Sequence, residues 1–587
     1  MIPQLKFIFG YLKQHKFSYI AGVFFIILTN LISVTIPEYL KLSIDLISKY
    51  SVSLQDNQSQ LFRYLLIMLL LAISIVFVRA LSRIFFFNPG RAIEYKIKND
   101  LFAKLTQLQK DYYDKNPTGG IISRIQNDIN GVRLICGFGM MQMFNIATAL
   151  SLTPYKMWQL SPQLTLYIVV PILIVFVIIR IGMHFVTRNM RTRMVALQNL
   201  SSFVVSSLSG IDIIKGFNLF DWNVAKLNQH NSRMLKLSLR ISFFRSFLMP
   251  VLQNLENILK IIILSIGGYY VINAGFTIGE LTAFMAYSAL LSMPIMGLGW
   301  LTTIIQTGLV GLTSIETIIS QKTDKIDLVR SPKSELSGLF NAGIEVKNLK
   351  YSYPGSATPV LKDISFTIMP DQTVGILGKI GSGKTTLVNC LNRYFSVPDG
   401  SIFVGGKDIN SFSRADIRHI VRTVSQDVFL FSDTILCNIL FGAENEEEIT
   451  QEITERIVFE AALKDEIDRF PNEYETMIGE RGIMLSGGQK QRISLARSMM
   501  APHDLLILDN VLSAVDNETE RFLLKHIMKR RTARSLLIVS HRVQALEEAD
   551  LILVLDEGRI ADSGTHKELI NQPGLYYETW CLQEQGK

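Results

Sequence analysis

The sequence predicts an α-helical membrane domain with six transmembrane helices, followed by an α/β domain with a largely parallel sheet. Apolar segments of membrane-spanning length recur six times in the first part of the chain. After residue 343, short β-branched strands alternate with helical patterns, as in parallel α/β domains. We therefore expect the membrane domain at residues 1–320, a polar linker at residues 321–342 and the α/β domain at residues 343–587.

The composition fits a chain that is half membrane protein. Of its 587 residues, 48% are hydrophobic and only 19% are charged, against about 25% charged in ordinary soluble domains. Disordered, collagen-like and fully soluble proteins are excluded. The four cysteines lie far apart without metal-binding spacing, which argues against a disulfide framework and a zinc site.

Each predicted span has the roughly 20 helical residues that a hydrocarbon layer of about 30 Å requires. None has the small-residue cleavage site of a signal peptide. The six spans are Tyr19 to Tyr39, Leu61 to Val78, Ile135 to Trp158, Leu164 to Gly182, Val251 to Ile272 and Ile278 to Leu301.

Basic residues alternate between the connections of these spans. The long connections Arg91 to Arg133 and Arg188 to Arg245 are rich in Lys and Arg, whereas Ser51 to Gln60 and Asn273 to Thr277 contain none. The positive-inside rule places the long connections, both termini and the α/β domain in the cytoplasm. The net charge of +8 is therefore mostly a consequence of topology, and we expect no nucleic-acid partner.

The spans contain a few charged residues whose roles differ. Glu256 and Lys260 lie four residues apart on the fifth span, so they can pair on one helical face. A polar clamp between helices and a substrate contact both fit this pair. Arg79, Arg83 and Arg180 lie near the inner ends of spans, where arginines snorkel, and we expect them to have no substrate role.

The α/β domain contains a phosphate-binding loop. The strand Val374 to Leu377 is followed by Gly378-Lys379-Ile380-Gly381-Ser382-Gly383-Lys384-Thr385, and a helical pattern begins at Thr386. In this GxxxxGK[ST] motif the glycines let backbone N–H groups face phosphates, the lysine supplies a point charge and the threonine hydroxyl reaches Mg²⁺.

Two further segments fit the same chemistry. Leu485-Ser486-Gly487-Gly488-Gln489 opens a helix, and the apolar strand after it ends at Asp509, a position from which a carboxylate holds Mg²⁺ through water. His541 follows another buried strand, at the sheet edge where ligands of open α/β sheets bind. A γ-phosphate contact is the favoured role for this histidine over a structural one.

The order of these motifs resembles the nucleotide-binding domain of an ATP-binding cassette (ABC) protein, a P-loop NTPase. The phosphate loop, Gln426, LSGGQ, Asp509, Ser513-Ala514-Val515-Asp516 and His541 follow one another as in that family. With six spans in front, the whole chain resembles a half-transporter of the ABC exporter superfamily, type IV fold. Details around Phe429 to Thr434 are most similar to the bacterial multidrug-resistance-like branch that works as heterodimers.

The resemblance implies roles for individual residues. Tyr353 stacks on adenine, although an ordinary strand tyrosine is the alternative, and Asp509, Gln426 and Thr385 serve Mg²⁺. Ser486 and its neighbours close over ATP held by a partner chain, so the working unit is a dimer. The implied ATP-binding residues are Tyr353, Gly378, Gly381, Ser382, Gly383, Lys384, Thr385, Thr386, Ser486, Gly487, Gly488, Gln489 and Asp516, and the catalytic group is Gln426, His541 and position 510.

One residue departs from the family pattern. An active cassette has a glutamate directly after the Walker B aspartate, but this chain has Asn510. An amide can position water without accepting its proton, and loss of a general base costs about 10² to 10⁴ in rate. We therefore expect a site that binds ATP and hydrolyses it poorly, as in one half of a heterodimer. An engineered, hydrolysis-blocked protein and a homodimer remain alternatives.

The predicted function is export of amphipathic or hydrophobic, drug-like or lipid-like compounds across a bacterial inner membrane, with ATP and Mg²⁺ as cofactors and a second half-transporter as partner. Peptides, thiols and lipids are alternative cargoes, because this fold does not determine its substrate. A non-hydrolysing regulatory subunit is the alternative from a different class. It is favoured by Asn510 alone, whereas the complete membrane half favours the exporter.

Overall fold

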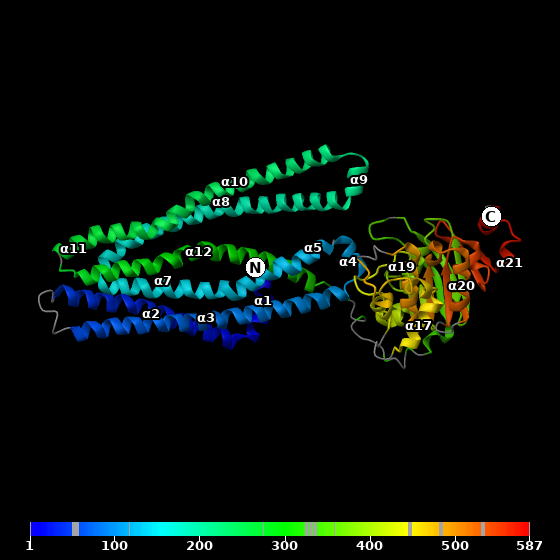
Figure 1. Ribbon diagram of the computed structural model, residues 1–587, viewed down its shortest axis with the longest axis horizontal. Coiled ribbons are helices and arrows are strands. Elements are labelled where there is room, and N and C mark those ends of the chain that lie inside the picture. The colour runs from blue at the N-terminus through cyan, green and yellow to red at the C-terminus, as the bar shows by residue number, and fades with distance from the viewer. Residues whose placement is uncertain are drawn as a thin grey trace. The chain divides into compact units, whose positions relative to one another are not determined.

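The computed structural model (Figure 1) describes residues 2–49, 58–116, 118–273, 275–321, 323, 327, 332, 336, 338–356, 358–443, 449–479, 485–529 and 534–585. Most of the predicted linker 321–342 lies outside these residues. The chain divides into two compact units. The first contains Met1–Thr106 and Lys115–Gln321, and the second contains Gln107–Asp114 and Lys322–Lys587.

The first unit consists of helices. The six predicted spans are confirmed, because among the described residues six helical segments are long and apolar enough to cross a membrane. The elements are α1 (Ile2–Gln14), α2 (Lys16–Lys49), α3 (Gln58–Gln107), α5 (Thr118–Ser123), α6 (Ile129–Leu134), α7 (Met140–Leu160), α8 (Pro162–Ser209), α9 (Ile211–Gly216), α10 (Phe220–Ile262), α11 (Gly268–Asn273) and α12 (Ile278–Ile319), with π-helical turns at Arg124–Asp128, Ile135–Gly139 and Ile263–Gly267.

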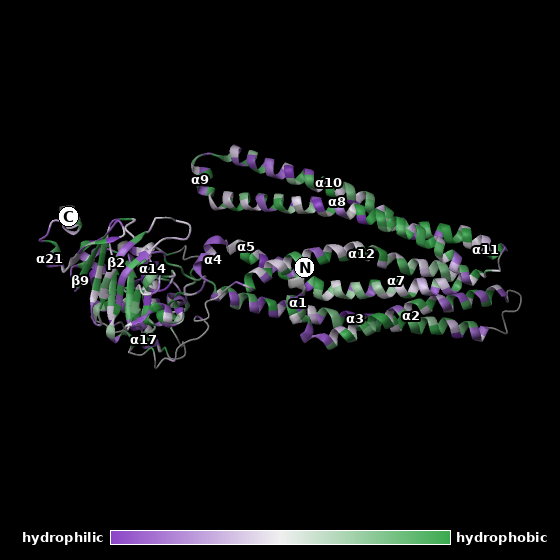
Figure 2. Ribbon diagram, turned by 180° about the vertical axis from the view of Figure 1, so that it is seen from behind, coloured by the Kyte–Doolittle hydropathy of each residue, from purple (hydrophilic) through white to green (hydrophobic). Residues whose placement is uncertain are grey.

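The longest helices exceed the thickness of a bilayer. With 50 and 48 residues, α3 and α8 are about 75 and 72 Å long at 1.5 Å per residue. Figure 1 shows α8 and α10 as an antiparallel pair joined by α9. Figure 2 shows these two helices becoming more polar toward α9, as expected for helices that continue beyond the hydrocarbon layer.

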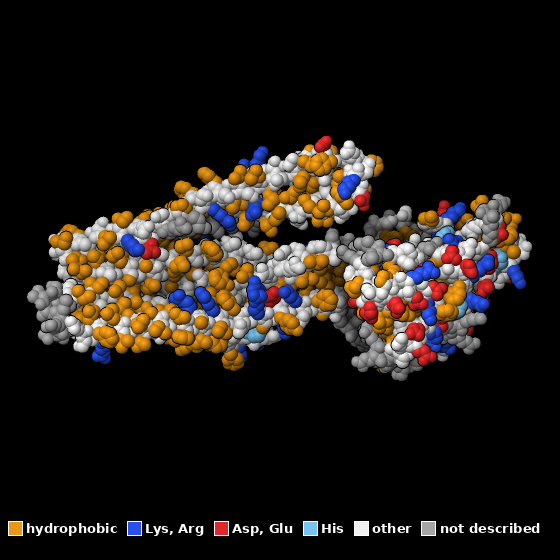
Figure 3. Space-filling view, viewed as in Figure 1, with side chains coloured by type: hydrophobic (Ala, Val, Ile, Leu, Met, Phe, Trp, Pro, Cys, Tyr) orange, Lys and Arg blue, Asp and Glu red, His pale blue; other side chains and the backbone are white. Residues whose placement is uncertain are grey.

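Helix α12 is the centre of this unit. It packs against α2, α6 and α7, and to a smaller extent against α10. Phe284 and Tyr287 on α12 are buried, and the Tyr287 hydroxyl donates a hydrogen bond to the Val34 carbonyl of α2 at 3.1 Å. Many hydrophobic side chains on the outer faces of the helices are exposed, as Figure 3 shows, which is the surface expected for contact with lipid.

The outer ends of α2 and α12 are joined by polar contacts. Thr277 caps α12 in a capping box with Glu280. Lys41 pairs with Glu280 at 2.8 Å, and the Asp45 carboxylate accepts from the Gly279 N–H at 2.9 Å. A Cβ atom on Gly279 would lie 2.4 Å from Asp45 Oδ1, so this close approach requires glycine.

The predicted pair on the fifth span is confirmed. Lys260 Nζ lies 2.7 Å from Glu256 Oε1 on α10, and about a third of each side chain is exposed.

The second unit is an α/β domain with two sheets. Its elements are α4 (Lys110–Lys115), β1 (Ile344–Tyr351), β2 (Leu361–Ile368), β3 (Thr373–Gly378), α14 (Lys384–Leu391), β4 (Ile402–Val404), β5 (Lys407–Asp408), α15 (Arg414–Ile420), β6 (Val421–Val424), α16 (Ile435–Leu440), α17 (Gln451–Glu460), α18 (Lys464–Ile467), α19 (Gly487–Met499), β7 (Leu505–Asp509), α20 (Asn517–Lys529), β8 (Ser535–Val539), β9 (Leu551–Asp556), β10 (Arg559–Gly564), α21 (His566–Leu569) and α22 (Leu575–Gln585), with 3₁₀ turns at Leu339–Ala342, Ile409–Ser411, Glu473–Glu475, Val511–Ala514 and Val543–Leu546.

The larger sheet has the strand order β10-β9-β3-β8-β7-β6, in which only β10 pairs in antiparallel fashion. The smaller sheet, β2-β1-β4-β5, is antiparallel. Strands β7 and β8 are buried along their whole length, as expected for parallel strands covered on both faces. The predicted α/β class is confirmed.

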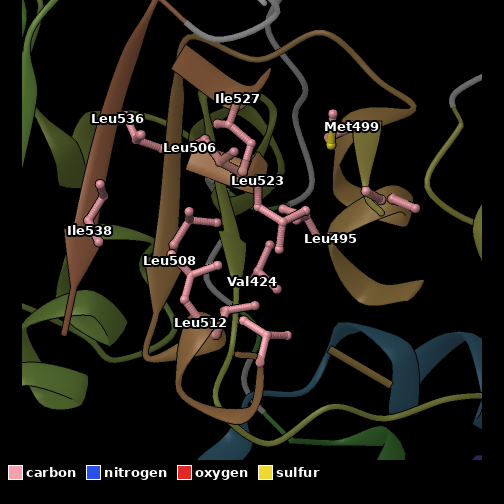
Figure 4. Packing of buried hydrophobic residues seen from close by; sticks show 14 of the residues in the cluster. Val424, Leu495, Met499, Leu506, Leu508, Leu512, Leu523, Ile527, Leu536 and Ile538 are labelled. Carbon is pink, nitrogen blue, oxygen red and sulfur yellow. The ribbon is translucent and has the colours of Figure 1, made fainter. Parts of the chain in front are cut away.

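One hydrophobic cluster fixes the helices against this sheet. Figure 4 shows side chains of β6, β7 and β8 meeting those of α19 and α20. Because β3, β7 and β8 are parallel neighbours, Gly378, Asp509 and Val539 end at one edge of the sheet. The predicted site residues follow these strand ends.

Candidate functional site

The loop between β3 and α14 has the backbone conformation of a phosphate cradle. Gly381 and Gly383 have φ values of 85° and 103°, in the left-handed region that only glycine enters without strain. Gly383 directly precedes the first turn of α14. This geometry leaves the loop N–H groups and the helix N-terminus available for an anion.

The side chain of Lys384 is bound to the phosphate loop itself. Its Nζ atom donates hydrogen bonds to the carbonyl oxygens of Gly378 at 2.7 Å and Lys379 at 2.8 Å. Burial lowers the pKa of Lys384, and the nearby Asp509 carboxylate opposes that shift. The loop carbonyls therefore hold the ammonium where phosphate oxygens would replace them.

Asp509 lies at the end of β7 and is 2% exposed. Burial raises the pKa of Asp509, while a hydrogen bond from the Thr385 hydroxyl and the charge of Lys384 partly offset this rise. A buried carboxylate beside a hydroxyl gives the oxygen ligands that Mg²⁺ prefers.

Asn510 and His541 contact each other beside this carboxylate. The Nδ1 atom of His541 lies 3.0 Å from the Oδ1 atom of Asn510. Asn510 has φ 54°, a left-handed conformation that asparagine tolerates better than most residues. Burial, followed by the charges of Arg542 and Lys384, lowers the pKa of His541, so its ring is neutral at neutral pH.

These residues surround a cavity of about 940 Å³. Tyr353 lies on its wall with 42% of its surface exposed, and its hydroxyl hydrogen-bonds to Thr386 Oγ1 at 3.0 Å. The structure brings together Tyr353, Gly378, Gly381, Gly383, Lys384, Thr385, Thr386, Gln426, Asp509, Asn510 and His541 on this wall.

Some wall residues were missed by sequence reasoning. Thr579 of α22 reaches the cavity although it lies about 200 residues after the phosphate loop and belongs to no motif. Two hydrogen bonds join α22 to the segment that follows β8. The Gln583 side chain donates to the His541 carbonyl at 2.8 Å and accepts from the Val543 N–H at 2.9 Å. Val360 and Ile380 also line the cavity and carry no chemical signal in the sequence.

The LSGGQ segment lies outside the cavity lining. Ser486 is the N-cap of α19 and forms a capping box with Gln489, so Gly487 and Gly488 make up the first turn of that helix. Asp516 is also outside the lining. Its carboxylate accepts from the Thr519 N–H and hydroxyl at 3.0 and 2.8 Å, and these bonds lower its pKa.

The cavity fits ATP and Mg²⁺. It combines a phosphate cradle with a lysine ammonium, a buried carboxylate–threonine pair and an exposed aromatic ring. The buried Ser382 hydroxyl has no hydrogen-bond partner among the described residues. A bound anion in the loop would give it one.

Comparison with known proteins gives matches to both units. The family model described as "ABC transporter transmembrane region" matches residues 19–295, and the model described as "ABC transporter" matches residues 361–513. A probable multidrug resistance ABC transporter ATP-binding/permease protein of Bacillus subtilis (strain 168) is 30% identical over 586 residues, 100% of this chain and 98% of that one.

Two other relatives and one solved structure extend this result. The multidrug resistance-like ATP-binding protein MdlA of Escherichia coli (strain K12) is 28% identical, covering 98% of this chain and 95% of its own. The ATP-dependent lipid A-core flippase of Syntrophus aciditrophicus (strain SB) is 30% identical, covering 84% and 81%. A bacterial Atm1-family ABC exporter with ATP bound superimposes with a TM-score of 0.83 at 22% identity, covering 97% and 98%, which shows a shared fold.

Proposed function

Since the chain belongs to the ABC transporter family, with the transmembrane region and the ATP-binding domain on one polypeptide, we propose that it is one subunit of an exporter that moves amphipathic or hydrophobic compounds out of the cytoplasm by alternating access. The observation that carries this proposal is the 940 Å³ phosphate-loop cavity in a chain whose described residues include six helices long and apolar enough to span a membrane. Relatives named for multidrug resistance and for lipid A-core flipping support the cargo class.

In this proposal the protein contacts the nucleotide at its adenine base and at its phosphates. The adenine stacks on the exposed ring of Tyr353, and the phosphates lie in the loop that contains Gly381 and Gly383. Lys384 exchanges its two loop carbonyls for phosphate oxygens, which gives it stronger, charge-assisted partners.

Thr385, Asp509 and Gln426 would hold Mg²⁺ in this cavity, Asp509 through water. When bound there, the ion would supply positive charge that balances the phosphate oxygens. Asp509 has to be ionised for this role, and Lys384 and Thr385 favour its ionised form.

Hydrolysis at this chain's own site is proposed to be slow. Asn510 directly follows Asp509, where the family pattern has the general-base glutamate, and an amide can orient water but cannot take up a proton. The absence of a base there costs about 10² to 10⁴ in rate. His541 would contact the γ-phosphate in the same site.

We propose that a second half-transporter supplies the productive site. Ser486, Gly487, Gly488 and Gln489 lie outside this chain's own cavity, so they are available to close over ATP in a facing chain, with Asp516 beside the interface. A partner with a glutamate after its Walker B aspartate would complete one consensus site. The heterodimer is favoured by Asn510, and a homodimer is the alternative.

ATPase measurements on the purified full-length chain test these proposals. We expect near-background turnover for the chain alone, both before and after Asn510→Glu, and activity when a half-transporter with an intact Walker B glutamate is added. A rise of about 10² to 10⁴ in the Asn510→Glu chain alone would instead establish a homodimer. Background turnover with every such partner, despite ATP binding, would favour the non-hydrolysing regulatory subunit.

A further inference from the structure

A cavity of about 340 Å³ opens within the first unit, between α2, α3, α7 and α12. Arg79 and Arg83, one helical turn apart on α3, lie on its wall, and both are exposed. Both were expected to snorkel without a substrate role, and the structure places both on a cavity wall. The facing wall adds the side-chain amides of Asn30, Gln142 and Asn145.

The charge of this cavity is unbalanced. Of the described residues that line it, none is acidic, and no acidic side chain of the described chain forms an ion pair with Arg79 or Arg83. Three lysines on other spanning helices do have acidic partners. These pairs are Lys41 with Glu280, Lys156 with Glu38 and Lys260 with Glu256.

A second cavity of the same unit is also lined by basic residues and by no described acidic residue. It lies between α8 and α12, has a volume of about 580 Å³, and is lined by Arg180 and His184 with Thr302 and Gln306. None of its described lining residues is acidic. Arg180, too, was expected only to snorkel. Basic residues without acidic ones thus line cavities on two sides of α12.

The first cavity combines cationic and apolar side chains. Arg79 is 18 residues beyond Leu61, about 27 Å along α3, which places it near the cytoplasmic boundary of a hydrocarbon layer of about 30 Å. Val34, Leu290 and Met293 add apolar surface to the lining, beside the hydroxyls of Ser33 and Thr153. A ligand that matches this lining combines a charged group with a hydrocarbon part.

We propose that this cavity binds an amphiphile with an anionic head, a carboxylate, sulfate or phosphate, held by Arg79 and Arg83. The inference rests on the proposed export function and assigns it a substrate class. The guanidinium groups offer paired N–H donors that match such oxyanions. A cationic amphiphile would meet two like charges with no carboxylate to receive it.

Binding to the full-length chain in phosphatidylcholine nanodiscs tests this proposal. Three fluorescent probes share a nitrobenzoxadiazole-labelled dodecyl chain and end in a carboxylate, a primary amide or a trimethylammonium group. We expect the carboxylate probe to bind about 10- to 100-fold more tightly than the amide, the range of a charge-assisted hydrogen bond, and the ammonium probe most weakly. The double variant Arg79→Gln/Arg83→Gln should lose that preference and bind the amide as before.

A matched variant separates the cavity from surface charge. Arg63→Gln removes an exposed arginine from the same helix, outside the cavity lining, and should leave the carboxylate preference intact. Equal affinities for carboxylate and amide in the native chain, or equal losses in the Arg63→Gln and the double variants, would overturn the proposal. Binding of labelled ATP, measured on the same samples, reports independently on the proposed export function.

Two further arms identify the source of the anion. If a membrane lipid occupies the cavity, phosphatidylglycerol in the nanodisc should weaken binding of the carboxylate probe in the native chain and not in the double variant. If a free oxyanion is sufficient, inorganic phosphate should compete in the same way. Competition by neither supports a whole anionic amphiphile, and competition that persists in the double variant contradicts the assignment to Arg79 and Arg83.

Discussion

The imidazole Nδ1 atom of His541 lies 3.0 Å from the amide oxygen of Asn510. In this orientation Nδ1 is the donor, so Nε2 of a neutral ring can only accept and does not suit a phosphate oxygen. Rotation of the amide would let Asn510 donate to Nδ1 and leave Nε2–H directed at a phosphate. An asparagine permits both arrangements, whereas a carboxylate accepts only from a protonated Nδ1.

This difference predicts an effect of Asn510→Glu on the histidine. The pKa of His541 is lowered in the native chain, so its ring should stay neutral, and reactive toward diethyl pyrocarbonate, to a lower pH than an ordinary histidine. A glutamate at position 510 should raise that pKa and move the loss of reactivity to higher pH. Mass spectrometry of the modified peptide measures this. Asn510→Gln is the neutral control, and an equal shift in both variants would refute the electrostatic explanation.

Replacing Lys384 with alanine should weaken ATP binding by about 10- to 100-fold, the range of a lost charge-assisted hydrogen bond. Its ammonium already bridges two loop carbonyls in the phosphate loop. Titration with a fluorescent ATP analogue measures the affinity. Lys407→Ala, at an exposed lysine of β5 outside the cavity, is the control, and equal affinities in the two variants would contradict the site.

Tyr353 provides a test of the adenine position. Tyr353→Ala should reduce ATP affinity by about 10- to 100-fold, because stacking of a base on an aromatic ring contributes about 1–3 kcal/mol. Tyr353→Phe keeps the ring and loses only the hydrogen bond to Thr386, so its affinity should remain close to native. Inorganic triphosphate has no base, and its binding should be the same in all three proteins. A similar loss for ATP and triphosphate would reject stacking.

The ionised carboxylate of Asp509 should destabilise the nucleotide-free protein at neutral pH. Its pKa is raised in the folded chain, so its stabilising form is the protonated one, which is lost as the pH rises through the folded pKa. At neutral pH, Asp509→Asn should therefore raise the Tm by a few degrees, since about 1 kcal/mol corresponds to about 2–4 °C in a domain of this size.

The same variant should lose the thermal stabilisation that ATP with Mg²⁺ gives the native chain. Thermal unfolding with and without the ligand measures both effects. Asp465→Asn, at an exposed position of α18, should change neither. A lower Tm for nucleotide-free Asp509→Asn would mean that the carboxylate stabilises the empty site.

Glu256 and Lys260 should be energetically coupled. Removal of either partner leaves a lone charge at bilayer depth. The destabilisations caused by Glu256→Gln and by Lys260→Met should therefore add up to more than the destabilisation of the double variant. We expect a coupling on the order of 1 kcal/mol, given the partial exposure of the pair. Thermal unfolding in detergent measures it. Lys110 and Asp114, with the same spacing outside the spans, should couple less, and simple additivity at Glu256 and Lys260 would contradict the pairing of their charges.

The sequence predicts the features of this protein that depend on residues close together along the chain. Six spans follow from hydropathy, and the phosphate loop follows from Gly381, Gly383 and Lys384, whose chemistry requires those residue types at those positions. Asp509 and His541 could be assigned because parallel strands end at a common edge.

Residues whose role depends on packing could not be predicted in this way. Thr579 reaches the cavity only because Gln583 fixes α22 to the segment after His541. Arg79 and Arg83 share the lining of a cavity with residues of α2, α7 and α12, three helices that lie far from them in the sequence. Position along a helix predicts membrane depth, but the direction that a side chain takes around the helix axis depends on its neighbours.

The segment Gln107–Asp114 belongs to the second unit although the chain on both sides of it belongs to the first. Lys110 lies over the ring of Tyr394, with Nζ 5.8 Å from the ring centroid. Tyr394 adjoins Phe395, which in turn packs edge-on against Tyr353. During synthesis this segment leaves the ribosome about 280 residues before its aromatic partner. At about 5–20 residues per second it waits for roughly 14 to 56 s, so the packing of the nucleotide-binding half is completed by a piece of chain that was synthesised long before the rest of that half.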